Sequence, residues 1–231
     1  MQDDFETVLT AAQKRVLATL NATLADRLSA MGPEESGLYS YYVRKLEHDA
    51  LFSQCDLQAL EILRMRTGQF GRVWEIGPGV GQLSIMLALD GHQVVAVESE
   101  SRRAAALLAL LDALEKIDGS ARDRIAVVQG SFPEALDALD PVERDAVVCL
   151  GCTFTAVESK YSAFAAALAR FGLGVIDFSC LFTWAPDRAE WRRRARDFAS
   201  AHGVETTLTT EFFIPEANRG GELFVMTPSE S

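Results

Sequence analysis

The glycine-rich segment Gly77 to Gly81 is the part of the sequence best suited to bind a ligand. It reads Gly77-Pro78-Gly79-Val80-Gly81 and directly follows the apolar stretch Arg72 to Ile76. Glycines let a ligand approach backbone N–H groups and permit a tight turn with positive φ. The start of a following helix adds partial positive charge, which attracts a carboxylate or phosphate. The segment predicts a loop that holds the polar part of a nucleotide-like ligand.

Glu98 is the expected companion of this loop. It ends the next apolar stretch and follows Gly77 by 21 residues. In α/β nucleotide-binding folds, a carboxylate about 20 residues beyond the glycines accepts hydrogen bonds from ribose hydroxyls. A ribose 2′-phosphate would be repelled at this position. Without the glycines, Glu98 would be interpreted as a solvated strand end.

Dinucleotide cofactors are the first competitors for such a loop, and three features argue against them. The glycine spacing is Gly-x-Gly-x-Gly, whereas dinucleotide folds use Gly-x-Gly-x-x-Gly. An acid, Glu75, precedes Gly77 by two residues. The chain also closes with two strand-like stretches, 204–213 and 222–227, whose connection is too short for a helical crossover. These stretches predict an antiparallel hairpin at a sheet edge.

Short β-branched stretches alternate with helical ones from Arg72 onward, which is typical of a parallel sheet covered on both faces. The predicted strands are 72–76, 93–97, 124–129, 145–150 and 173–180, and the predicted helices are 81–89, 101–117, 156–171 and 187–202. Before them, apolar residues recur every three or four positions from Phe5 to Met31, and a second helical stretch covers 39–64 with interruptions. We expect an α/β, doubly wound, mostly parallel sheet in residues 67–231, preceded by a helical extension in residues 1–66.

The motif acid-x-Gly-x-Gly-x-Gly, formed by Glu75, Gly77, Gly79 and Gly81, resembles the first motif of the Rossmann-like (class I) S-adenosylmethionine-dependent methyltransferases. The resemblance covers about residues 71–227 and implies that family's seven-stranded sheet and its cofactor, S-adenosylmethionine. It implies that Glu75 and the loop, including Pro78, surround the methionine portion.

The same resemblance implies further cofactor contacts at the ends of later strands. Glu98 and its neighbour Ser99 would hold the ribose, and Ser131 would replace the aspartate that often binds the adenine amino group. Phe132 would pack on the adenine face, although ordinary loop packing explains Ser131 and Phe132 equally well. Leu150 and Gly151 would form a floor shared by cofactor and acceptor.

No residue stands out as catalytic, and three are candidates. His48 is a candidate base, with pairing to a carboxylate such as Asp49 as the alternative, and Tyr42 or its neighbour Tyr41 is a candidate cover of the cofactor, with half-burial at a helix–sheet junction as the alternative. Asp177 ends an apolar strand where α/β sheets bind ligands, with strand-end capping as the alternative. Cys149 and Cys152 have the spacing of a zinc half-site, but no second pair accompanies them, so we expect no metal.

Composition and missing motifs suggest the acceptor. The 231-residue chain carries a net charge of −11, which repels phosphate backbones. The arginines between Glu190 and Asp197 have the spacing of solvated ion pairs. The region after the fourth strand lacks the Asp/Asn-Pro-Pro-aromatic motif of nucleic-acid amino methyltransferases. We expect a small-molecule acceptor, methylated on O or N, and no nucleic-acid partner.

The predicted location is the cytoplasm, because the start of the chain is acidic and the longest apolar run, 104–111, cannot span a membrane. The sequence does not indicate an oligomeric state. Two other functions stay open at this point. An aminopropyltransferase shares the fold, but its paired aspartates are replaced by Gly151-Cys152-Thr153-Phe154. A binding protein with a degenerate methyltransferase fold is the non-enzymatic alternative.

Overall fold

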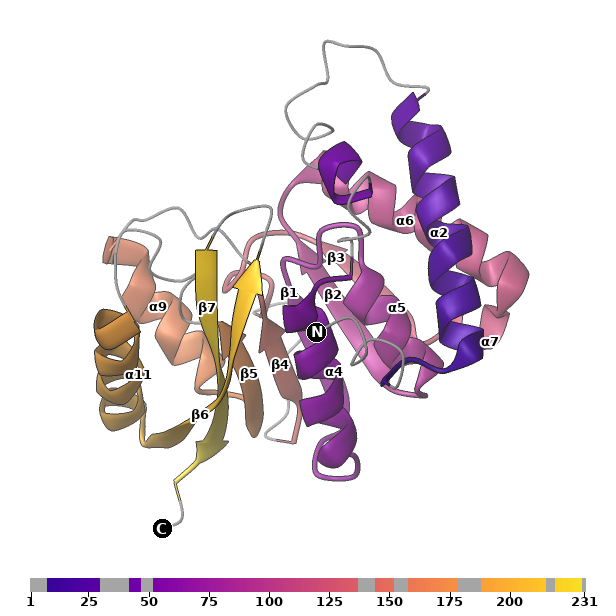
Figure 1. Ribbon diagram of the computed structural model, residues 1–231. Helices are drawn as coiled ribbons and strands as arrows, with labels where there is room; N and C mark the ends of the chain where they lie inside the picture. Colours follow the sequence, from indigo (N-terminus) through magenta and orange to yellow (C-terminus); the bar gives the residue numbers. More distant parts are fainter. Residues whose placement is uncertain are drawn as a thin grey trace.

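A seven-stranded sheet with the strand order β3-β2-β1-β4-β5-β7-β6 forms the centre of the protein (Figure 1). The computed structural model describes residues 8–29, 42–46, 52–136, 144–151, 158–177, 188–214 and 219–229. Five strands are parallel: β1 (Arg72–Ile76), β2 (Gln93–Glu98), β3 (Ile125–Gln129), β4 (Ala146–Cys149) and β5 (Leu173–Asp177). The strands β6 (Val204–Ile214) and β7 (Arg219–Pro228) form an antiparallel hairpin that joins the sheet along β5. The predicted sheet and its closing hairpin are confirmed.

Helices cover both faces of the sheet. One face carries α5 (Gln82–Leu89) and α6 (Ser101–Ile117) together with α2 (Ala11–Ser29) and α4 (Gln54–Met65). The other carries α9 (Glu158–Leu168) and α11 (Arg188–His202). A short helix that was not predicted, α7 (Gly119–Arg122), precedes β3. Among the described residues, the helices are too short or too polar to cross a membrane.

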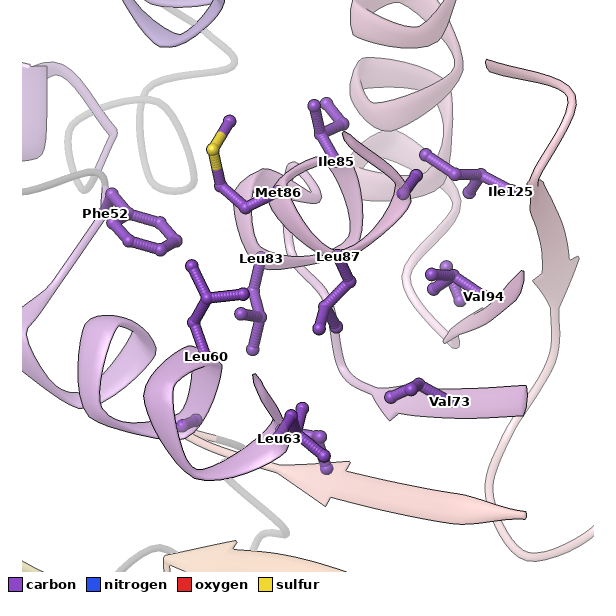
Figure 2. Close-up of a cluster of buried hydrophobic side chains, with 14 of the residues drawn as sticks. Phe52, Leu60, Leu63, Val73, Leu83, Ile85, Met86, Leu87, Val94 and Ile125 are labelled. Carbon is purple, nitrogen blue, oxygen red and sulfur yellow. The ribbon is translucent and has the colours of Figure 1, made fainter. Parts of the chain in front are cut away.

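Alternation along each strand divides the core into two clusters. On β1, Val73 joins the cluster that contains α4 and α5, whereas Trp74 joins the cluster that contains α9 and α11. Figure 2 shows the first cluster, in which Leu60 and Leu63 of α4 meet Leu83 and Leu87 of α5 above the sheet. Because strand side chains alternate between faces, Glu75 faces the same side as Val73, towards α4 and α5.

The helix α2 is part of this packing. Its stripe of Val16, Leu20, Leu24 and Leu28 is buried in the same cluster as the sheet. A polar contact also holds its N-terminal end: Arg64 Nη1 donates to the carbonyl of Val8 at 2.6 Å, and Arg64 Nε donates to Asp90 at 2.6 Å. The division of the chain at residue 66 is therefore not marked by a break in the core, and it stays a prediction.

Asp145 joins the amino ends of β1 and β4. Its side chain is fully buried and accepts hydrogen bonds from Arg72 Nη2 at 2.7 Å and from Trp74 Nε1 at 3.0 Å. The backbone N–H of Arg72 donates to the same carboxylate at 3.1 Å. This network lies at the edge of the sheet opposite the glycine loop. It holds together β1 and β4, the two strands at which the strand order reverses.

Candidate functional site

The glycine loop lies at the point where the strand order reverses. From β1 the chain continues outward through β2 and β3, and it then returns to the other side of β1 as β4. In open α/β sheets, ligands bind at the carboxyl ends of the strands beside such a reversal. The loop occupies the carboxyl end of β1, so the topology places it where a ligand is expected.

The loop adopts the backbone that its glycines predicted. Gly77, Gly79 and Gly81 have φ values of 69°, 61° and 82°. Such values are unfavourable for residues with a side chain. At Gly81 a side chain would also collide with α6, because a Cβ there would lie 2.2 Å from Leu107 Cδ1. Gly81 is the N-cap of α5, so the loop leads directly into the start of a helix.

Glu98 is held against this loop and is not a solvated strand end. Its side chain is 2 % exposed. One carboxylate oxygen accepts a hydrogen bond from the N–H of Gly79 at 3.2 Å, and the other accepts from the N–H of Glu100 at 2.9 Å. The structure thus brings together the two features that the sequence paired, the middle glycine and the carboxylate 19 residues later.

Glu75 lies beneath the loop in a buried, acidic surrounding. Its side chain is 7 % exposed, and the hydroxyl of Ser84 on α5 donates a hydrogen bond to it. Burial, together with the nearby carboxylates of Asp56 and Glu98, raises the pKa of Glu75 to about 8, while the bond from Ser84 opposes this. Glu75 is therefore mostly protonated at neutral pH.

Two neighbours of the loop come from the N-terminal region. Asp56 forms a capping box with Ser53 at the start of α4 and acts electrostatically on Glu75. The buried Tyr42, in the short helical segment 42–46, reaches the loop from above: a Cβ on Gly79 would lie 2.8 Å from Tyr42 Oη. Tyr42 was a candidate from the sequence, whereas Asp56 was missed. The Ser-x-x-acid pattern marked a helix start, but nothing local linked it to Glu75.

Gln82 is a further polar group that the sequence analysis missed. It is the first residue of α5 and is 7 % exposed, and its side-chain nitrogen has no hydrogen-bond partner within the described part of the chain. Buried donors are nearly always paired, so an unpaired one next to a glycine loop fits a site that accepts a polar ligand. The available signal was a glutamine at the head of a mostly apolar helix.

These residues fit S-adenosylmethionine. The loop has left-handed backbone at Gly77, Gly79 and Gly81, and the unpaired Gln82 amide is a donor available to a ligand. Glu98 presents a carboxylate at the strand end where a ribose is expected. The acidic surroundings of Glu75 suit a ligand that carries positive charge.

The remaining predicted cofactor residues lie at the same edge of the sheet. Ser99 and Ser131 are exposed, and Gly151 is an exposed glycine with a φ of 60°. Leu150, between β4 and Gly151, packs partly against the first core cluster. Phe132 is 7 % exposed, and its ring packs edge-on against Phe164 with 4.9 Å between centroids, as the packing alternative expects. Contacts of these five residues with a cofactor stay predictions.

The structure describes only some of the candidate catalytic and metal-binding residues. Asp177 is fully buried at the end of β5, opposite Leu223 of β7, and its role in acceptor binding stays a prediction. His48, Cys152 and Tyr41, the neighbour of Tyr42, lie outside the described residues. Within the described ranges, Cys149 is a buried free thiol, and no group of three or more potential metal ligands occurs.

Four arginines of α11, Arg188, Arg192, Arg193 and Arg194, form ion pairs within the protein. Arg193 bonds to Glu190 at 2.5 Å and to Asp197 at 2.8 Å, and Arg194 bonds to Glu190 at 2.8 Å. Arg192 instead reaches the hairpin, where it bonds to the fully buried Glu222 at 2.7 Å. The prediction that this stretch forms helix-face pairs is confirmed, and Arg192 additionally ties α11 to β7.

Comparisons with known proteins relate the fold to methyltransferases. The sequence matches no protein-family model and no curated protein sequence. Among solved structures, the methyltransferase domain of bacterial CtHen1 is 14 % identical, with a TM-score of 0.57 over 73 % of this chain and 96 % of that one. Precorrin-6y C5,15-methyltransferase of Geobacter metallireducens is 18 % identical, with a TM-score of 0.50 over 75 % and 87 %. PH1948 of Pyrococcus horikoshii, assigned as an RNA methyltransferase, is 19 % identical, with a TM-score of 0.54 over 75 % and 82 %.

The prediction that nucleic acid is excluded as a partner is wrong. A protein assigned to RNA methylation shares this fold over three-quarters of the chain, as does a precorrin methyltransferase. The exclusion relied on net charge, which describes the whole molecule and not the surface around one site. The missing Asp/Asn-Pro-Pro-aromatic motif identifies only one type of nucleic-acid methyltransferase. With its strand order, closing hairpin and glycine loop, this chain has the fold of the class I S-adenosylmethionine-dependent methyltransferases.

Proposed function

We propose that this chain binds S-adenosylmethionine and transfers the methyl group to an acceptor. The observation that carries the proposal is the pairing of Glu98 with Gly79 at the reversal of the strand order. A carboxylate held at this place accepts hydrogen bonds from ribose hydroxyls. The loop and the start of α5 receive the methionine portion, whose carboxylate is attracted by the helix terminus.

The protein's task in this reaction is mainly alignment. S-adenosylmethionine supplies a methyl group that is already activated by the positive sulfur. Holding an acceptor in line with it is worth effective molarities of about 10⁵ to 10⁸ M. A base adds about 10²- to 10⁴-fold when the acceptor must lose a proton. We place the acceptor beside Leu150, Gly151 and Asp177, which follow or end the neighbouring strands β4 and β5.

Calorimetric titration tests the donor half of the proposal. Wild-type protein is titrated with S-adenosylmethionine, with S-adenosylhomocysteine and with NAD⁺, and we expect binding of the first two only. Glu98→Gln should weaken both. Glu100→Gln is a matched control, because Glu100 is the adjacent acid but serves as the N-cap of α6, accepting from the N–H of Arg103 at 2.8 Å. Absence of binding by both ligands would contradict the proposal.

Transfer of a radiolabelled methyl group tests the acceptor half. The protein is incubated with labelled S-adenosylmethionine and, separately, with a small-metabolite fraction and with total RNA. Methyl transfer is supported if label enters either fraction and if less label enters with the Glu98→Gln variant. The labelled fraction then identifies the acceptor class. Donor binding without transfer to either fraction would favour a binding protein with this fold.

A further inference from the structure

We propose that Glu75 and Asp56 form a charge-sensing corner of the donor site, in which Glu75 releases a proton to solvent when the sulfonium donor binds and regains one when the thioether product forms. This inference rests on the proposed function. It concerns how the site distinguishes S-adenosylmethionine from S-adenosylhomocysteine, which differ by one methyl group and one positive charge.

The geometry places this corner next to the loop. Glu75 precedes Gly77 by two residues. Its side chain points towards α5, where Ser84 donates a hydrogen bond to it. Ser84 follows Gly81 by three residues, so Glu75 lies under the helix start that is proposed to receive the methionine portion. Asp56 approaches from the first turn of α4, on the same face of the sheet.

The charges around Glu75 are mostly negative. Asp56 acts on it from α4 and Glu98 acts on it from β2, while α5 contributes the uncharged hydroxyl of Ser84. Asp56 is itself affected: burial raises its pKa, whereas Lys45 of the segment 42–46 and the bonds from Ser53 lower it. A buried carboxyl among like charges stays protonated until a cation approaches.

A bound sulfonium is such a cation. An opposite charge about 4–6 Å away lowers the pKa of a carboxyl group by roughly 1 to 3. Starting from a pKa of about 8, Glu75 would titrate between about 5 and 7 in the complex. At pH 7 the binding of one donor molecule then releases about 0.4 to 0.9 of a proton.

The consequence is a pH-dependent preference for donor over product. Ionised Glu75 attracts the sulfonium of the donor, but it interacts little with the uncharged thioether of the product. Raising the pH towards 8 ionises Glu75 in the free protein, so the affinity for S-adenosylmethionine rises while that for S-adenosylhomocysteine changes little. The ratio of the two affinities should increase about 7- to 70-fold between pH 6 and pH 8.5.

Calorimetry in two buffers measures this proton directly. The protein is titrated with S-adenosylmethionine at pH 7, once in phosphate and once in Tris. The difference between the two observed heats equals the number of protons released multiplied by the difference between the ionisation heats of the two buffers. We expect about 0.4 to 0.9 proton for the wild type and for the control Glu100→Gln. Glu75→Gln, an uncharged isostere of the protonated acid, should bind the donor with release near zero.

Asp56→Asn provides a second variant if Glu75→Gln does not fold. Removing this negative neighbour lowers the pKa of Glu75 in the free protein, so proton release at pH 7 should fall below the wild-type value. Wild-type binding with equal heats in the two buffers would overturn the inference and leave the proposed function intact. Undiminished release in Glu75→Gln would overturn it as well. Absence of donor binding in every buffer would instead overturn the proposed function itself.

Discussion

Replacing Gly79 by alanine tests the glycine loop with a single methyl group. Gly79 has a φ of 61°, and the new Cβ would lie 2.8 Å from Tyr42 Oη. The left-handed backbone costs alanine about 1–2 kcal/mol relative to glycine. The contact itself adds little, because the hydroxyl is the far end of a side chain that can move. For a chain of this size, we expect Tm to fall by about 2–8 °C.

We expect Gly79→Ala to weaken donor binding more strongly than it lowers the stability of the protein. The added methyl group stands between the ligand and the backbone of the loop, and overpacking of about 1–3 kcal/mol corresponds to roughly a 5- to 150-fold loss of affinity. Calorimetry measures the affinity, and thermal unfolding measures Tm.

Gly91→Ala is the matched control for this substitution. Gly91 has a φ of 94°, and a Cβ there meets nothing within 4 Å. The Gly91→Ala variant should lose about as much stability as Gly79→Ala and should keep the wild-type affinity for the donor. If Gly79→Ala lost stability but bound S-adenosylmethionine as tightly as the wild type, the reasoning that places the donor on this loop would be refuted.

Three further substitutions test separate parts of the account. Glu98→Gln should weaken donor binding about 10- to 150-fold, because hydrogen bonds to a charged group contribute about 1.5–3 kcal/mol; unchanged affinity in calorimetry would show that the ribose does not bind this carboxylate. Asp145→Ala should lower the free energy of unfolding in urea by about 3–5 kcal/mol, since Arg72 and Trp74 lose a buried partner; a loss below about 1 kcal/mol would contradict that role. Glu75→Gln should stabilise the protein at high pH. The folded protein keeps the Glu75 proton up to a pKa of about 8, whereas an ordinary glutamate releases it near 4.5, so the wild type loses stability as pH rises through this window. The variant should gain on the order of a few kcal/mol at pH 8.5 and nothing at pH 4, and equal pH profiles would show that Glu75 is not buried as described.

The sheet and the loop could be predicted because their signals are local. The strands are short β-branched stretches bounded by turns, and their predicted limits lie within one residue of the observed ones for β1, β2 and β3. The glycines predicted positive φ at Gly77, Gly79 and Gly81, and all three have it. The pairing of Glu98 with the loop followed from spacing alone, because consecutive parallel strands end at the same edge.

The contacts around Glu75 could not be predicted because they join distant segments. Asp56 precedes Glu75 by 19 residues, and only the packing of α4 brings it close enough to act on this carboxyl group. Phe132 shows a different limit: an aromatic residue after a strand suits an adenine or a core equally, and the ring of Phe164 decides its packing. The exclusion of a nucleic-acid partner was wrong because net charge does not describe the surface around one site.

A crystal structure of the protein with bound S-adenosylmethionine tests the central claim most directly. We expect ribose hydroxyls within hydrogen-bond distance of the Glu98 carboxylate, and the methionine portion over the loop from Gly77 to Gly81, next to the start of α5. Ligand density at another place, or none in crystals grown with saturating donor, would contradict it.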